Sequence, residues 1–364
     1  MADGINKSIE IRILIKEKQK DIKIKIGGKA YITEEKTNER YELVNDSEYE
    51  IEAVDDLFAR INDYSVKLPF YIENSNPHSY IEIDGIKYKG RFRIYSDSKR
   101  LNIVEHIDLE RYLWGVLAPE MGSSWPKEAL KSQAVAARTY AIYSIKRGNE
   151  YDLTATTKHQ LYTGFENISP QIISAVSETK GEVLTYKGNL FPAYYHANSG
   201  GHTTNPSAAW DCEKIPPLKG VKDPYAKYSK NYSWSIFLPS KDITEFLNRQ
   251  GNYVSKIKNI RIYSKDKSGR AIKLLISTDK GNIRVEAKDL REFIGTFDIK
   301  STFISKIEKR SLGFKIYGRG WGHGIGLCQD GAKKMADLGF NYKKILEFYY
   351  PGSKIMNIEK VYEY

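Results

Sequence analysis

Alternation of apolar and polar residues over positions 8–105 is the feature that most restricts the fold of this chain. It is clearest in IEIRILI (9–15), IKIKI (22–26), YIEIDGIKYKGRFRIY (80–95) and LNIVEHI (101–107), and turn-forming GG, NSNP and DG segments separate the runs. A period of two places alternate side chains on opposite faces of a strand. We therefore expect a β-rich N-terminal region. The lysines near residue 20 are expected on the solvent face of a strand rather than in a nucleic-acid patch.

The pattern then changes to a helical period. DLERYLWGVLAPEM (108–121) predicts a helix with Asp108 as its N-cap, ended or kinked by Pro119. PKEALKSQAVAARTYAIYSIKR (126–147) predicts a second helix, with Pro126 in the first turn. Its many alanines favour close approach of a neighbouring backbone or a substrate, so we expect this helix to be central and buried.

Strands and turns return after residue 150. Residues 182–204 read as a hairpin followed by a glycine-rich loop, and 251–277 as a second hairpin with SGR at its turn. Helices are expected at 241–249 and 288–296. The fold class is therefore α+β. We expect a β-rich region over 1–105, a mixed core of 106–232 and 317–364 around the Ala-rich helix, and a strand-rich inserted subdomain over 233–316.

Glycines occupy every second position from 318 to 326. On a strand, one face would be bare backbone and the other would carry Arg319, Trp321 and His323 in a row. This arrangement is compatible with a ligand slot and equally with a structural glycine-rich turn. The GxGxxG and GxxxxGK[ST] nucleotide-binding signatures are both absent. The following residues, 330–339, predict a helix.

Composition excludes several classes of protein. The 364 residues are 41 % hydrophobic and 28 % charged, which is close to the globular average, and the net charge is +11. An excess of basic over acidic residues favours anionic partners. RNA- and DNA-binding signatures are missing, however, so no nucleic-acid partner is expected. No run of about 18 apolar residues predicts a membrane span. The opening MADGINKSIEIR has no apolar signal-peptide segment, which leaves a cytoplasmic protein or an export segment outside this chain as alternatives.

Several residue types suggest chemistry. Glu120 lies among apolar and small neighbours, which disfavour the charged form of a carboxyl, as a general acid requires. His196, His202 and Cys212 are candidate metal ligands, to which His323 and Cys328 could be added, but their spacing matches no zinc motif. Ser199 in NSGGH does not form the GxSxG of a serine hydrolase. The two cysteines, far apart in the sequence, are expected to be idle thiols, with one long-range disulfide as the alternative.

Five ordered blocks resemble the SpoIID/LytB family. They are YLWGVLAPEMGSSWPKEALKSQAVAARTYA (112–141), HQLYTGF (159–165), TKGEVLTYKGNLFPAYYHANSGGHT (179–203), PLKGVKDPY (217–225) and GRGWGHGIGLCQDGAKKMA (318–336). The resemblance covers about residues 80–364. It implies a lytic transglycosylase of peptidoglycan whose catalytic acid is the glutamate of the EM pair, here Glu120. The alternative within the family is a non-catalytic, glycan-binding modifier of a cell-wall amidase.

The resemblance also implies the reaction. Glu120 as an acid would protonate the oxygen that links MurNAc to GlcNAc, and the bond would break through an oxocarbenium-like state. The MurNAc 6-hydroxyl would close onto C1 while the Glu120 carboxylate takes its proton, giving a 1,6-anhydro-MurNAc end. A second carboxylate is not required. The preferred substrate would be glycan without stem peptides, and the setting would be sporulation and engulfment.

Other residues of these blocks are expected to line the glycan groove: Arg138, Gln160, Tyr162, Tyr195, Ser199 and His323. Direct contact with Glu120 would make Arg138 oppose acid catalysis, so Arg138 is expected to bind substrate or to lie one hydrogen bond away. Trp125 and Trp321 could stack on sugar rings or pack in the core.

The chain departs from the family pattern at Gly122, where a proline is common, and at Asp330, where a tyrosine is usual. Cys212 is not at an obviously equivalent spacing to the metal ligands of some members, so no cofactor is predicted. The family acts outside the cytoplasm. We therefore expect an extracytoplasmic, wall-facing protein that is secreted or membrane-anchored, with the anchor outside this chain, and a cell-wall amidase as partner.

Overall fold

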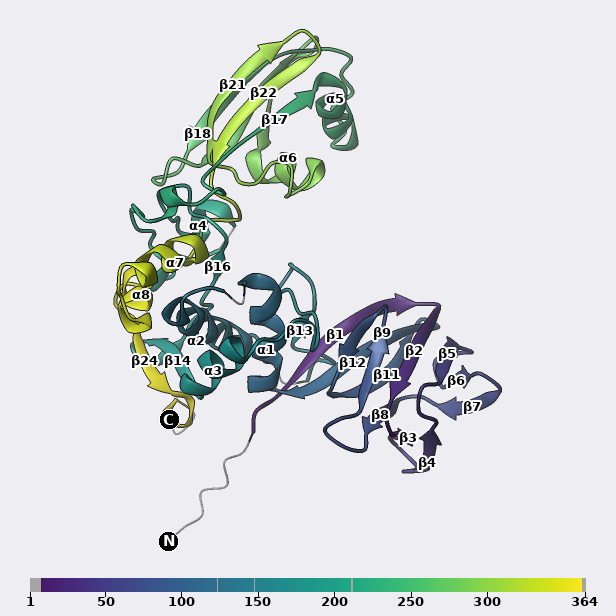
Figure 1. The fold of residues 1–364 in the computed structure, drawn as a ribbon. Helices are drawn as coiled ribbons and strands as arrows, with labels where there is room; N and C mark the ends of the chain where they lie inside the picture. Colours follow the sequence, from purple (N-terminus) through teal and green to yellow (C-terminus); the bar gives the residue numbers. More distant parts are fainter. Residues whose placement is uncertain (1–7, 123, 147, 211, 362–364) are drawn as a thin grey trace. The chain divides into compact units, whose positions relative to one another are not determined.

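The computed structural model describes residues 8–122, 124–146, 148–210 and 212–361. The expectation about the MADG segment therefore concerns residues outside the described ranges. The chain divides into two compact units. The N-terminal unit comprises 1–125 and 137–181, and the C-terminal unit comprises 126–136 and 182–364, so that the boundary runs through one helix. The α+β class is confirmed (Figure 1), whereas the three-region division stays a prediction.

The N-terminal unit opens with twelve strands in two sheets, which confirms the β-rich region. They are β1 (Glu10–Gln19), β2 (Asp21–Gly27), β3 (Ala30–Glu34), β4 (Arg40–Leu43), β5 (Glu48–Ala53), β6 (Phe58–Ile61), β7 (Tyr64–Lys67), β8 (Phe70–Asn74), β9 (Tyr80–Ile83), β10 (Ile86–Tyr88), β11 (Arg91–Asp97) and β12 (Arg100–Asp108). One sheet has the order β13-β1-β12-β11-β8-β3-β4 and the other β10-β9-β2-β5-β6-β7, where β13 is Leu153–Thr154.

Strand β2 shows why the alternation forms sheets. Ile22, Ile24 and Ile26 are buried on one face. Lys23 and Lys25 on the other face lie opposite Glu50 and Glu48 of β5. The lysine-rich face is therefore a solvated surface with cross-strand charge pairs, as expected.

Three helices follow in this unit: α1 (Leu109–Glu120), the second half of α2 (Lys127–Tyr143) and α3 (Pro170–Glu178). The Asp108 side chain caps α1 by accepting the N–H of Arg111 at 3.1 Å, as predicted. Pro119 lies in the last turn, and the helix ends one residue later. Helix α2 ends four residues before the predicted position, because the backbone turns from Ser144 onward.

The C-terminal unit contains the remaining elements. The strands are β14 (Glu182–Tyr186), β15 (Asn189–Leu190), β16 (Tyr195–His196), β17 (Ser233–Pro239), β18 (Ile257–Lys265), β19 (Ala271–Thr278), β20 (Gly281–Glu286), β21 (Ile304–Arg310), β22 (Gly313–Arg319), β23 (Leu327–Cys328) and β24 (Lys354–Asn357). The helices are α4 (Pro206–Ala209), α5 (Ser240–Arg249), α6 (Ala287–Ile294), α7 (Gln329–Asp337) and α8 (Tyr342–Tyr349), with 3-10 turns η1 (Pro216–Leu218), η2 (Ala226–Tyr228) and η3 (Ile358–Lys360). Among the described residues, none of the helices combines the length and the apolar composition that crossing a lipid bilayer requires.

Two apolar clusters hold this unit together. One surrounds Phe314 and Leu274 in the 233–316 segment, and the other surrounds Leu327, Tyr350 and Leu184. The hairpin predicted over 251–277 forms as β18 and β19. The one predicted over 182–204 forms only as β14 and β15, because β16 pairs in parallel with the distant β23.

The alternating glycines do not lie on a strand. Strand β22 ends at Arg319, and Gly320, Gly322, Gly324 and Gly326 all have positive φ, between 69° and 105°. Repeated left-handed residues cannot continue a strand, and they are favourable only for glycine. The segment is an irregular loop, so the row of Arg319, Trp321 and His323 on one strand face does not exist.

Candidate functional site

Glu120 is the last residue of α1 and is half-buried. Its neighbour Met121 is buried, and the Met121 N–H donates to the Leu117 carbonyl at 2.9 Å, which closes the helix end. The partial negative charge at the C-terminal end of a helix disfavours a second negative charge there. Helix α1 thus places a carboxyl at its C-terminal end, where this dipole effect acts.

Arg138 lies in the interior beneath this helix and is fully buried. Its Nε donates to Glu110 Oε1 at 2.9 Å and its Nη2 to Glu110 Oε2 at 2.6 Å, while Nη2 also reaches the Val176 carbonyl at 3.3 Å. This two-pronged bond joins α2 to α1 and α3. This position gives Arg138 a scaffolding role and does not support direct binding of substrate by its side chain.

Gln160 and Tyr162 are also interior residues. Gln160 accepts the hydroxyl of Tyr112 at 3.0 Å and donates to the Ala137 carbonyl at 3.3 Å. The Tyr162 ring packs 5.0 Å from that of Tyr112. Both side chains are at most 2 % exposed, so they fix α1 against α2 rather than present groups to a glycan.

Glycine is required at Gly115 for this packing. A β-carbon there would lie 2.3 Å from the Gly164 carbonyl oxygen and 2.5 Å from the Tyr162 ring. Two of the family-like blocks, YLWGV and YTGF, thus meet through their glycines. At Gly122 the packing is looser, since a β-carbon there would lie 3.3 Å from the half-buried Trp125 ring.

The other predicted residues form a second group, in the C-terminal unit. Ser199 is fully buried and donates its hydroxyl to Asp223 Oδ2 at 2.7 Å, and its N–H lies 3.2 Å from Cys328 Sγ. Because Ser199 is enclosed in this way, it holds its own loop in place. Tyr195 is half-buried in β16.

The tautomers of two histidines follow from their hydrogen bonds. His323 Nε2 lies 2.9 Å from the Tyr195 carbonyl, which can only accept, and His323 Nδ1 accepts the N–H of Ile325 at 3.0 Å. His196 Nδ1 donates to the Ile325 carbonyl at 3.1 Å. Burial lowers the pKa of His196 far below its usual value and that of His323 to about 3. Both rings are therefore neutral, and both nitrogens of His323 are already used.

The candidate metal ligands do not gather around one point. His202 Nδ1 lies 2.6 Å from the Thr203 carbonyl, and Cys212 is exposed. Across the described ranges, no group of three or more His, Cys, Asp or Glu side chains is arranged to hold a metal ion. Cys212 and Cys328 are both free thiols, one exposed and one buried, so the structure shows no disulfide between them.

Asp330, the departure from the family pattern, has a structural role here. Its Oδ2 accepts the side-chain N–H groups of Asn198 at 2.9 Å and Asn231 at 3.1 Å. The carboxylate thus joins α7 to the NSGGH loop. Trp321 is covered on one side by the Lys300 ammonium, 4.4 Å from the ring centroid.

Arg270 is an important residue that sequence reasoning missed. It is 2 % exposed, and its guanidinium donates to the carbonyls of Ser199 and His202, each at 2.6 Å. It comes from the SGR turn, where the sequence indicates a turn and nothing more. Glu110 and Asp223 were also missed by sequence reasoning. An arginine in a helix that was expected to be buried needs an acidic partner, so Arg138 was a signal for Glu110.

Comparison with known proteins gives this geometry a context. The SpoIID family model, described as "Stage II sporulation protein", matches residues 97–186, which include Glu120, Arg138, Gln160 and Tyr162. Stage II sporulation protein D of Bacillus subtilis is 30 % identical, over 69 % of this chain and 75 % of that protein. The chain belongs to the SpoIID family.

Other relatives of this SpoIID-family protein carry less specific names. An uncharacterized protein of Brachyspira hyodysenteriae is 34 % identical over 77 % of this chain and 75 % of the relative. The "Amidase enhancer" of Bacillus subtilis is 30 % identical over 81 % of this chain, which spans about half of that longer protein. A second family model, a domain of unknown function (DUF8618), matches residues 210–326.

Proposed function

We propose that this SpoIID-family protein is a lytic transglycosylase that cleaves the MurNAc–GlcNAc bond of peptidoglycan glycan strands, preferably strands without stem peptides. The observation that carries the proposal is Glu120, half-buried at the end of α1. The glutamate ends a helix that the Arg138–Glu110 pair and the Tyr112–Gln160 bond hold rigidly. A general acid needs this kind of fixed position.

The reaction needs only that one carboxyl. The Glu120 proton passes to the glycosidic oxygen, and the bond from C1 of MurNAc to that oxygen breaks through an oxocarbenium-like state. The 6-hydroxyl of the same MurNAc then bonds to C1, and its proton returns to the Glu120 carboxylate. The products are a 1,6-anhydro-MurNAc end and a free GlcNAc hydroxyl, and no water is consumed.

Within this proposal, the other predicted residues have different roles. Arg138, Gln160 and Tyr162 position the helix that carries Glu120. Ser199 and His323 hold the glycine-rich loop of the C-terminal unit, and Tyr195, with its half-buried ring, is the residue of that group that could touch a sugar. A wall-facing location outside the cytoplasm, secretion or anchoring, and a role in sporulation or engulfment belong to the same proposal, supported by the relatives' names. The net charge of +11 would retain the protein on anionic wall polymers.

A second function is that of a glycan-binding modifier of a cell-wall amidase. The similarity to the protein named "Amidase enhancer" favours it, although the chain spans about half of that protein. In this case Glu120 would be dispensable, and the amidase would be the catalytic partner.

One experiment separates these functions. Purified protein and the Glu120→Gln variant are incubated with long glycan strands stripped of stem peptides, and the products are read by mass spectrometry. We expect 1,6-anhydro-MurNAc ends from the wild type alone. Reducing ends would indicate hydrolysis, and glycan binding without cleavage would favour the amidase modifier. Equal cleavage by the variant would exclude Glu120 as the catalyst.

A further inference from the structure

The edge of β17 in the 233–316 segment is open. This strand is the outer member of the sheet β17-β22-β21, whereas β18 lies beside the opposite edge strand, β21. Gly320 N–H bonds to the Tyr232 carbonyl at 2.8 Å and Ser240 N–H to the Leu312 carbonyl at 3.0 Å. In an antiparallel ladder of this register, the even-numbered residues of β17 bond to β22.

The odd-numbered residues therefore direct their backbone groups away from the sheet. These residues are Ser233, Ser235 and Phe237, and their N–H groups have no partner within the described part of the chain. All three side chains are exposed, and that of Phe237 is 42 % exposed. Such an edge can accept another strand.

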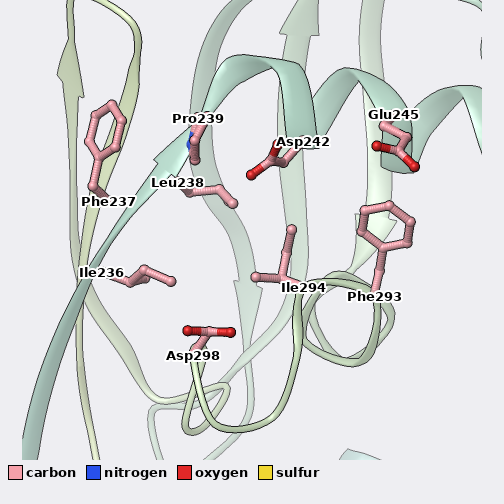
Figure 2. Close-up of a pocket in the computed structure, with 9 residues that line it drawn as sticks. All are labelled: Ile236, Phe237, Leu238, Pro239, Asp242, Glu245, Phe293, Ile294 and Asp298. Atoms are coloured by element: carbon pink, nitrogen blue, oxygen red, sulfur yellow. The ribbon is translucent and has the colours of Figure 1, made fainter.

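A cavity of about 330 Å³ adjoins the same strand. Its apolar wall comes from residues 236–239 of β17 and from Phe293 and Ile294 at the end of α6. Its acidic groups are Asp242 and Glu245 of α5 and Asp298 after α6. Figure 2 shows the carboxylates of Asp242 and Asp298 on opposite sides of the apolar side chains.

The charges in this cavity are not balanced locally. Glu245 bonds to Arg249 at 2.6 Å, whereas Asp242 and Asp298 form no ion pair within the described residues. The whole chain carries +11, so an acidic cavity runs against the general charge of the molecule. An aliphatic stem that ends in a cation complements an apolar wall with carboxylates at its rim.

We propose that β17 and this cavity bind an extended segment of a partner polypeptide that carries a lysine or arginine. The segment adds as a strand to the open edge, using the backbone groups of Ser233, Ser235 and Phe237. Its basic side chain enters the cavity, with the stem against Ile236 and Ile294 and the charge near Asp242 and Asp298. The inference is independent of glycan cleavage, because it uses none of the residues assigned to that reaction.

The test uses the whole protein and the peptide Thr-Val-Lys-Val-Lys-Val-Thr-amide, which carries fluorescein on its N-terminal amine so that both lysines stay charged, and binding is followed by anisotropy. Matched peptides replace both lysines with norleucine or with glutamate. We expect the norleucine peptide to bind about 5-fold more weakly. The glutamate peptide should bind worst, although the net charge of the protein would favour it. Equal or tighter binding of the glutamate peptide would overturn the proposal.

Two variants separate the backbone edge from the cavity. Asp242→Asn with Asp298→Asn removes the carboxylate charges at constant shape, and we expect about 5-fold weaker binding of the lysine peptide. Asp337→Asn with Glu359→Gln makes the same charge change at exposed residues of α7 and η3, outside the cavity lining, and should leave binding unchanged. Ser235→Pro removes an outward N–H without touching the ladder to β22, and we expect binding about 10-fold weaker. Unchanged binding by both the cavity variant and Ser235→Pro would contradict the proposal.

A further measurement does not depend on the folding of a variant. Hydrogen exchange of the wild type should show protection of the Ser235 and Phe237 amides on addition of the lysine peptide, and absence of protection would rule out strand addition. Sedimentation of the protein alone tests whether a second copy of this chain occupies the edge instead. A dimer that Ser235→Pro abolishes would assign the edge to a second copy of this chain and overturn the assignment to a partner.

Discussion

The Arg138 guanidinium holds both carboxylate oxygens of Glu110, at 2.9 and 2.6 Å, in the interior between α1, α2 and α3. Glu110 Oε1 also accepts the Gly181 N–H at 3.3 Å. The pair thus fixes the helix at whose far end Glu120 lies. Arg138, which was expected to bind substrate, therefore supports the scaffold of the N-terminal unit, and this changes what its mutation should do.

Arg138→Gln should lower the free energy of unfolding by about 3 kcal/mol, because it leaves the half-buried Glu110 carboxylate without its charged partner. Denaturation in urea, followed by tryptophan fluorescence, measures the loss. The double variant with Glu110→Gln should recover part of it, since no unpaired charge remains. If Arg138→Gln unfolded at the wild-type midpoint and lost only affinity for glycan, the arginine would be a substrate-binding residue instead.

Stability should depend on pH through Glu105, a fully buried carboxyl that accepts the Gly90 N–H at 2.8 Å. Burial raises its pKa to about 7 from the usual 4.5. The Glu105 carboxyl loses its proton at a higher pH in the folded state than in the unfolded state. Its contribution to the free energy of unfolding is therefore complete below about pH 4.5 and is lost as the pH rises through 7. The shift corresponds to about 3 kcal/mol.

Glu105→Gln isolates this effect, because an amide oxygen can still accept the Gly90 N–H. Unfolding free energies of the wild type and the variant are compared at pH 5 and pH 7.5. We expect the wild type to lose stability over this range relative to the variant. Parallel pH profiles for the two proteins would show that Glu105 is ionised throughout.

Gly324→Ala should disturb the glycine-rich loop. The residue has φ of 83°, and a β-carbon there would lie 2.3 Å from the Arg270 guanidinium, which holds the Ser199 and His202 carbonyls. We expect a loss of about 3 kcal/mol in unfolding free energy, from backbone strain and displacement of Arg270. Gly339→Ala is the matched control, with φ of 87° and open space around it, and should cost about 1 kcal/mol. Equal losses would mean that strain alone matters.

The two thiols should differ in reactivity. Cys212 is exposed, whereas Cys328 is fully buried, and burial raises the pKa of the Cys328 thiol well above its usual value. Titration with an aromatic disulfide reagent should modify one thiol per native chain and both thiols in denaturant. Cys212→Ser should abolish the native reaction. A Cys328 that reacted at the same rate would indicate frequent opening of the loop around Ser199.

Several secondary-structure elements could be predicted from short stretches of the sequence. The capped helix ending at Glu120, the Ala-rich α2, the hairpin around the SGR turn and the β-rich start of the chain depend on local periodicity and on short-range caps. These are properties of consecutive residues, so a sequence can carry them. The neighbours of Glu120 made it one candidate acid among several chemical residues, and the family resemblance made it the leading one.

Contacts between distant segments account for what was missed. The alternating glycines were compatible with a ligand slot or with a structural turn. Their left-handed positions leave no room for a β-carbon, because residues from elsewhere in the chain, such as Tyr194, His196 and Arg270, lie against the loop. Gln160 and Tyr162 were expected in a groove and instead fill the interior, since their partners come from a helix about 50 residues earlier. Local pattern thus specified which segments form helices and sheets. Burial, which depends on how those segments pack, placed Arg138, Gln160 and Tyr162 in the interior and left Glu120 half-buried at the end of α1.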